Sequence, residues 1–226
     1  MYEHLEKNIA LWQERIGNAS ARWGKTEICA ATKTVDADTI NRAFAAGIRI
    51  IGENRVQELN EKVEFLNPEF EIHMIGGLQT NKVKALPERL SMVQSLDRLN
   101  LAEALSKRQC ALGKTLPVLI EINVSGEEQR SGVLEENFSE LFEAVCRLPN
   151  LKIDGLMAIM PIADDPEALR PYFRSLRTRF DRLRDAGYDL HTLSMGMSGD
   201  CLVAAEEGAT MVRLGRALFG ERPVKR

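Results

Sequence analysis

Eight short apolar runs separated by stretches of helical periodicity constrain what this chain of 226 residues can fold into. Each run has the length and the β-branched or aliphatic residues of a buried strand. The runs cover residues 28–32, 48–51, 72–75, 92–95, 118–124, 153–157, 192–195 and 211–214. The longest helical pattern between them puts Leu169, Phe173, Leu176, Phe180 and Leu183 on one face before Gly187.

Strands that alternate with helical or connecting sequence predict a (β/α)₈ barrel, the TIM-barrel class of α/β fold, which typically needs roughly 250 residues. The alternative is an open doubly wound sheet, which normally has fewer strands. Ahead of the first strand, Leu5, Ile9, Trp12 and Ile16 repeat at helical spacing. We therefore expect one domain over residues 1–226, with an extra N-terminal helix within residues 1–24 packed on the barrel.

Composition excludes several classes of protein. No apolar run approaches the roughly 20 residues of a membrane span, and the first residues lack the pattern of a signal peptide, so we expect a cytoplasmic protein that does not bind membranes. The net charge of −3 gives no general attraction to nucleic acid. Cys29, Cys110, Cys146 and Cys201 show no CxxC spacing, so we interpret them as core residues rather than as disulfides or metal ligands.

Polar residues follow several of the predicted strands, at the end where active sites of this fold lie. Lys33 follows the first strand, Asn54 the second, and Asn123 ends the fifth. Lys33 has two interpretations. It is either a solvated residue at the strand edge or an amine that loses its charge by desolvation and can attack an aldehyde.

The loops after the seventh and eighth strands resemble two halves of a phosphate cup. Gly196 and Gly199 let the backbone approach an anion closely, Ser198 supplies a hydroxyl, and Gly215 with Arg216 opens a helical turn. The alternative is that the glycines only form a tight turn and that Ser198 caps the next helix.

Arg213 lies within an apolar run, where strand alternation turns it toward the interior, opposite to Val212 and Leu214. A buried guanidinium needs a partner. The partner is either an internal carboxylate such as Glu121 or the ring nitrogen of a bound cofactor. An amine for an aldehyde, a phosphate cup and an arginine for a ring nitrogen together describe a site for pyridoxal 5′-phosphate.

Five sequence blocks carry a resemblance to a known family. They are ATKT at 31–34, IGENRVQE at 51–58, HMIGGLQTNK at 73–82, LSMGMS at 193–198 and VRLGRALFG at 212–220. In their order and over essentially the whole chain, these blocks resemble the pyridoxal phosphate homeostasis protein family. That family is related to the N-terminal barrel of alanine racemase, so the resemblance implies a barrel of fold type III among proteins that bind pyridoxal phosphate.

The resemblance implies that Lys33 holds the cofactor as a Schiff base. It implies that Asn54 lies near the ring and that Arg213 faces the ring nitrogen. The remaining residues of the expected cofactor site are Ser198, Gly199, Gly215 and Arg216 around the phosphate, with His73 and Met195 nearby, and Asn81 in the same region. Two positions depart from the family pattern. Arg55 replaces a common aromatic residue, and Arg216 replaces a common threonine, so the cup lacks one hydroxyl.

A bound cofactor does not by itself imply catalysis. A racemase needs a base on each face of the substrate carbon, and none of Tyr2, Tyr172 and Tyr188 is positioned by the sequence to be the second base. We therefore expect a monomeric, non-enzymatic protein that buffers pyridoxal phosphate and delivers it to apo-enzymes. The alternative is a racemase or lyase that acts as the barrel alone.

A third hypothesis is an interaction module for nucleic acid or protein. It is suggested by basic residues on one predicted helix, namely Arg170, Arg174, Arg177, Arg179, Arg182 and Arg184. Asp181 and Asp185 interleave with them, and all lie off the apolar stripe, so the pattern favours a solvated outer face.

Overall fold

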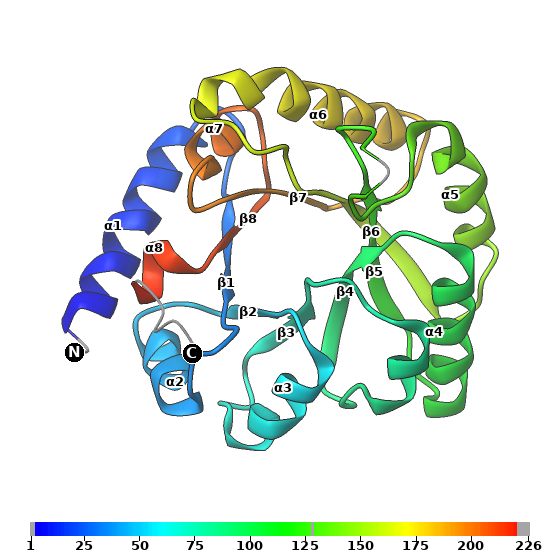
Figure 1. The fold of residues 1–226 in the computed structure, drawn as a ribbon, viewed down its shortest axis with the longest axis horizontal. Coiled ribbons are helices and arrows are strands. Elements are labelled where there is room, and N and C mark those ends of the chain that lie inside the picture. The colour runs from blue at the N-terminus through cyan, green and yellow to red at the C-terminus, as the bar shows by residue number, and fades with distance from the viewer. Residues whose placement is uncertain (1–2, 128, 221–226) are drawn as a thin grey trace.

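A closed barrel of eight parallel strands forms the centre of the molecule, which confirms the predicted (β/α)₈ class (Figure 1). The computed structural model describes residues 3–127 and 129–220. Each strand pairs with the next along the chain, and β8 closes the barrel against β1. The strands are β1 (Glu27–Ala31), β2 (Ile50–Glu53), β3 (Glu71–Met74), β4 (Leu90–Leu96), β5 (Leu116–Ile122), β6 (Leu151–Ala158), β7 (Thr192–Met197) and β8 (Met211–Leu214).

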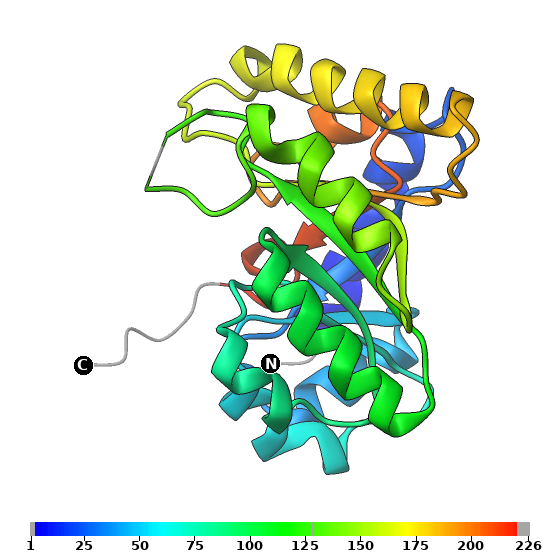
Figure 2. The ribbon, with the colours of Figure 1, turned by 90° about the vertical axis from the view of Figure 1, so that its right-hand side faces the viewer.

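Helices surround this barrel and cover the outward faces of its strands (Figures 1 and 2). They are α1 (Glu3–Ala19), α2 (Ala37–Ala45), α3 (Val56–Lys62), α4 (Leu99–Leu112), α5 (Phe138–Cys146), α6 (Arg170–Asp185), α7 (Cys201–Glu206) and α8 (Arg216–Phe219). Short 3₁₀ helices are η1 (Val63–Phe65), η2 (Thr80–Ala85), η3 (Glu135–Asn137) and η4 (Pro166–Leu169). The predicted stripe on α6 is buried at Phe173, Leu176 and Phe180, so it faces the strands.

Strand alternation separates two layers of side chains. Outward-facing residues such as Ala30, Val212 and Leu214 belong to the large core between the barrel and the helices. Inward-facing Cys29 and Met211 belong to a smaller apolar cluster inside the barrel. The barrel interior is therefore packed with side chains, and a ligand can reach it only from an end.

The N-terminal helix is present as predicted and packs against the last helices of the chain. Asn8 Nδ2 on α1 donates to the Leu218 carbonyl oxygen on α8 at 3.1 Å. After α1, the Trp23 indole N–H donates to the Glu206 carbonyl oxygen at 2.8 Å. Gly24 then turns the chain toward β1 with a φ of 99°. These contacts join the first and last helices of the described chain on one side of the barrel (Figure 1).

The boundaries of the second strand differ from the prediction. The apolar run ends at Ile51, but the ladder to β3 runs from Ile50 to Glu53, where Glu53 pairs with Met74. Glu53 is fully buried. An apolar run indicates burial but not backbone pairing, so the pattern did not predict that the strand extends to a buried carboxylate.

The interpretation of the cysteines as core residues is wrong for two of the four. Cys29 and Cys201 are buried, whereas Cys110 and Cys146 are exposed. Cys110 lies near the end of α4 and Cys146 ends α5, each on the solvent-exposed side of its helix. Hydrophobic composition of a segment does not decide which side of a helix a residue occupies.

Candidate cofactor site

Lys33 lies in a turn at the carboxyl end of β1, and its side chain is exposed. It continues the inward-facing set of Cys29 and Ala31, because side chains of a strand alternate. The turn is closed by the Val35 amide, which donates to the Thr32 carbonyl oxygen at 3.0 Å. Lys33 therefore lies at the end of the barrel where the strands terminate, and its side chain is accessible from solvent.

Thr34, the next residue of this turn, has a φ of 63°. A β-branched residue rarely adopts this left-handed region, and holding it there costs about 1–3 kcal/mol. Contacts with the surrounding structure must therefore hold the turn that carries Lys33 in this conformation.

Arg213 points from β8 into the barrel and is buried, as the strand alternation predicts. Its Nη1 donates to Ser194 Oγ at 2.7 Å and to the Ser194 carbonyl oxygen at 2.9 Å, and its Nη2 donates to the Ala158 carbonyl oxygen at 2.8 Å. These bonds start from two of the three nitrogens of the guanidinium, which has five N–H groups. Ala158 ends β6, so the charge lies near the mouth rather than at the bottom of the barrel.

Glu121, the carboxylate predicted as one possible partner of Arg213, makes no hydrogen bond to it among those of the described residues. Glu121 on β5 is buried, and burial raises the pKa of its carboxyl to about 7, with Asp97 raising it further and Arg213 opposing the shift. The hydrogen bonds recorded for the Arg213 guanidinium go to Ser194 and Ala158. Glu121 therefore acts on Arg213 electrostatically and not as its hydrogen-bond partner.

A chain of hydrogen bonds crosses the barrel from Arg213 to His73. Ser194 Oγ donates to Gln94 Oε1 at 2.7 Å, and Gln94 Nε2 lies 2.8 Å from His73 Nδ1. The direction of the chain follows from Arg213, which can only donate. Gln94 then donates to His73 Nδ1, so a neutral His73 carries its proton on Nε2.

His73 Nε2 lies 3.7 Å from the Glu71 carboxylate at the start of β3. This neighbour lowers the pKa of Glu71. His73 thus occupies the interior below the mouth, and it reaches Arg213 through Gln94 and Ser194.

Gln94 and Ser194 were not among the predicted site residues. Both carry a sequence signal, since each is a polar residue on the inward-facing phase of an otherwise apolar strand. Applying to them the alternation that identified Arg213 would have found them.

The two loops of the predicted phosphate cup are in contact. The Ala217 amide on α8 donates to Ser198 Oγ after β7 at 3.4 Å, so Ser198 links the two loops. Asp200 precedes α7 and makes no side-chain cap, and its carboxylate accepts instead from the Met197 amide at 2.5 Å. The hydrogen bonds therefore do not support the alternative in which Ser198 caps α7.

Glycine is required at one position of this cup. Gly196 has a φ of 91°, and a Cβ there would lie 2.5 Å from the Ala204 Cβ. A Cβ at Gly199 would meet no atom within 4 Å, so that position is open. Gly215 is buried before α8, and Arg216 is exposed at its start.

The other predicted residues lie in three different environments. Asn54 is half-buried after β2, and Gly76 packs so closely on it that a Cβ would come within 2.5 Å of the Asn54 carbonyl oxygen. Asn81 is exposed on η2. Met195 is fully buried in the outer core, on the opposite face of β7 from Ser194, so its side chain points away from the barrel interior where we expected it.

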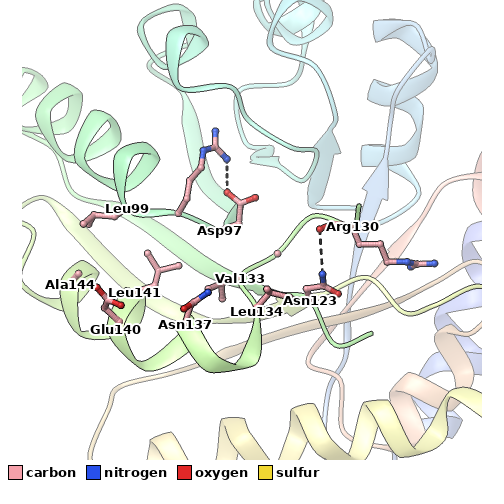
Figure 3. Close-up of a pocket in the computed structure, with 12 residues that line it drawn as sticks. Asp97, Leu99, Asn123, Arg130, Val133, Leu134, Asn137, Glu140, Leu141 and Ala144 are labelled. Atoms are coloured by element: carbon pink, nitrogen blue, oxygen red, sulfur yellow. Dashed lines mark hydrogen bonds and ion pairs between the residues drawn. The ribbon is translucent and has the colours of Figure 1, made fainter. Parts of the chain in front are cut away.

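A separate pocket of about 570 Å³ lies between the segments that follow β4 and β5 (Figure 3). Leu99, Leu134 and Leu141 give it an apolar wall, and Asn123 marks its barrel side. On its polar side, Arg98 Nη1 donates to Asp97 at 2.5 Å. None of the described residues predicted to hold the cofactor lines it.

The arginine-rich face of α6 is largely compensated by carboxylates. Arg170 pairs with Glu167, Glu206 and Glu207, Arg174 with Glu207, Arg177 with Asp181, and Arg179 with Glu135. This arrangement supports a solvated outer face. Among the described residues, no helix is long and apolar enough to cross a membrane, and no three His, Cys, Asp or Glu side chains gather as metal ligands.

Residues 2–223 match the family model described as the N-terminal domain of alanine racemase, which defines the class of barrel to which this chain belongs. The chain is 50% identical over 215 residues to the pyridoxal phosphate homeostasis protein of Aquifex aeolicus, covering 92% of this chain and 94% of the relative. The chain belongs to the pyridoxal phosphate homeostasis protein family.

Solved structures agree with this assignment. A protein of Bifidobacterium adolescentis superposes with a TM-score of 0.90 at 33% identity, covering 96% of this chain and 95% of the other. PipY of Synechococcus elongatus, solved with pyridoxal phosphate bound, gives a TM-score of 0.79 at 30% identity, covering 92% of this chain and 99% of PipY.

Proposed function

We propose that this protein binds pyridoxal 5′-phosphate as a Schiff base on Lys33 and buffers it in the cytoplasm for delivery to apo-enzymes. The observation that carries the proposal is the exposed Lys33 amine at the mouth of a barrel whose interior holds the buried Arg213 guanidinium. Membership of the family, together with the cofactor in the PipY structure, supports the choice of ligand.

The residues present fit this ligand. Ser198 and its contact with α8, with Gly199, Gly215 and Arg216 beside it, would hold the phosphate. Arg213 has N–H groups beyond those bonded to Ser194 and Ala158, and it would donate one to the ring nitrogen. Asn54 would lie beside the ring, and His73 would act on the site through Gln94 and Ser194.

When bound, the cofactor supplies an aldehyde carbon. The Lys33 amine, once deprotonated, attacks that carbon, and condensation releases one water. Because the Lys33 side chain is exposed, water and other amines have access to reverse the linkage. Reversible attachment suits a carrier.

The structure also supports a carrier over a racemase or lyase. Tyr172 is exposed on α6, and the Tyr188 ring packs edge-on against Phe142 with centroids 4.9 Å apart. Tyr172 therefore lies on an outer helix, and Tyr188 lies on the segment between α6 and β7, beside α5; Tyr2 is outside the described residues. Arg213 retains its proton and would leave the ring nitrogen unprotonated, so the ring would be a weak electron sink.

The test is an absorption spectrum of the protein incubated with pyridoxal phosphate. We expect a band near ~420 nm, the region of a protonated Schiff base of this cofactor, and fixation of the label on Lys33 by borohydride. Lys33→Ala should lose both, whereas Lys152→Ala, which alters an exposed lysine paired with Asp189, should keep both. An unchanged, borohydride-sensitive band in Lys33→Ala would refute the assignment. Turnover of alanine or serine by the loaded protein would refute the carrier role, and sedimentation tests the expected monomer.

A further inference from the structure

A second lysine, Lys62 at the end of α3, is buried directly behind the turn that carries Lys33. Its side chain is 9% exposed and forms ion pairs with Glu53 Oε1 at 2.7 Å and with Glu58 Oε1 at 3.2 Å. The Glu53 side chain is fully buried. The proposed binding of the cofactor uses none of these three residues, which we call the turn clamp.

The turn clamp holds the backbone on both sides of Lys33. Lys62 Nζ donates to the Thr32 carbonyl oxygen at 3.0 Å and to the Val35 carbonyl oxygen at 3.2 Å. Glu58 accepts a hydrogen bond from the Thr34 amide, and Glu53 accepts one from the Thr32 hydroxyl. Every residue of the turn except Lys33 itself is thus bonded to the clamp.

The turn clamp removes the charges of Glu53 and Lys62 from water, which is energetically unfavourable. Glu53 Oε2 is buried with no hydrogen-bond partner among the described residues. Burial raises the pKa of Glu53, although Lys62 opposes the shift. Buried ion pairs are often no more stabilising than apolar residues of similar size, so this clamp is weak as a device for stability alone.

The strain of Thr34 points to positioning instead. Its φ of 63° must be held by its surroundings, and its amide is bonded to Glu58. Lys33 lies between these bonded residues, directly after β1, and its side chain is exposed.

We propose that Lys62 is a positioning residue for Lys33: it fixes, from the outer side of the barrel, the strained turn that presents the Lys33 amine at the mouth. The consequence for cofactor attachment rests on the proposed function, whereas the effect on the turn does not.

The experiment compares Lys62→Met, the charge-balanced double variant Lys62→Met with Glu53→Gln, and the control Lys152→Met. The double variant is needed because Lys62→Met alone leaves Glu53 buried without its counter-charge. Amide hydrogen exchange at Thr34 and Val35 is measured on the protein without cofactor, and the affinity for pyridoxal phosphate is measured from the absorption band. Circular dichroism verifies the fold.

In the folded double variant we expect exchange at Thr34 and Val35 to accelerate by about tenfold or more, and cofactor affinity to fall by about tenfold, as for a reactive group held too loosely. Lys152→Met should change neither. Unchanged exchange in the folded double variant would refute the positioning role. Faster exchange with unchanged affinity would refute the link to cofactor attachment. Absence of a Lys33 label in the wild-type protein would instead reject the proposed function, and the exchange data would still decide the role of Lys62.

Discussion

Ser194 is the central link of the hydrogen-bond chain inside the barrel, and its hydroxyl can be removed alone by Ser194→Ala. The hydroxyl accepts from Arg213 Nη1 at 2.7 Å and donates to Gln94 Oε1 at 2.7 Å. Ser194 and Gln94 are fully buried, and Arg213 is 4% exposed. Arg213 keeps its bonds to the carbonyl oxygens of Ser194 and Ala158, but Gln94 Oε1 loses the donor from Ser194.

Leaving a buried acceptor unsatisfied costs about 1–3 kcal/mol, and a lost bond to a charged group is at the upper end of the usual range. We expect Ser194→Ala to lower the free energy of unfolding by about 2 kcal/mol, which corresponds to about 4–8 °C in Tm for a chain of this size. Urea denaturation of the cofactor-free protein, followed by circular dichroism, measures this free energy of unfolding.

Ser175→Ala is the matched control, because Ser175 is exposed on α6. Its effect should stay within about 0.5 kcal/mol. A loss below about 0.5 kcal/mol in Ser194→Ala, at an unchanged denaturant slope, would show that the chain of bonds does not stabilise the interior in the way described. A double-mutant cycle with Gln94→Met should give a coupling of about 0.5–3 kcal/mol.

Two further predictions concern the mouth and the interior. Gly76→Ala should destabilise the protein by about 1–3 kcal/mol and weaken cofactor binding, because its Cβ would lie 2.5 Å from the Asn54 carbonyl oxygen. Gly77→Ala, where no atom lies within 4 Å, should do neither, and equal effects in the two variants would contradict the packing argument. The pKa of Glu121 is raised to about 7 by burial, so its contribution to stability is fully present below about pH 4.5 and is lost as pH rises toward 7. Between these pH values the wild type should lose up to about 3 kcal/mol of unfolding free energy that Glu121→Gln does not lose. Parallel curves of unfolding free energy against pH for the two proteins would refute the raised pKa.

Local pattern was sufficient for much of this molecule. The eight apolar runs correspond to the eight strands in order, although the second strand extends to Glu53. The inward orientation of Arg213 followed from period two, because a strand fixes which side each residue faces. The family membership followed from contiguous motifs. These are features that neighbouring residues in the chain specify.

Burial of polar side chains on helices was not predictable in the same way. Lys62 follows Leu59 by three residues and is itself buried on α3, yet a lysine in a helix is normally read as solvated. Only its contacts with Glu53 of β2 and with the carbonyl oxygen of Thr32 explain its burial. Cys110 shows the converse, since an apolar residue in a core-forming helix is exposed.

The amino-acid sequence by itself determined the barrel, the order of its strands and the inward orientation of Arg213, because alternation and helical period are local properties of the chain. The tertiary structure decided the partners. Arg213 bonds Ser194 rather than Glu121, and Lys62 reaches the turn of Lys33 from the adjacent helix. Which polar groups meet depends on closure of the barrel and on the packing of α3 against it, and these distances between remote residues are set only when the whole chain has folded.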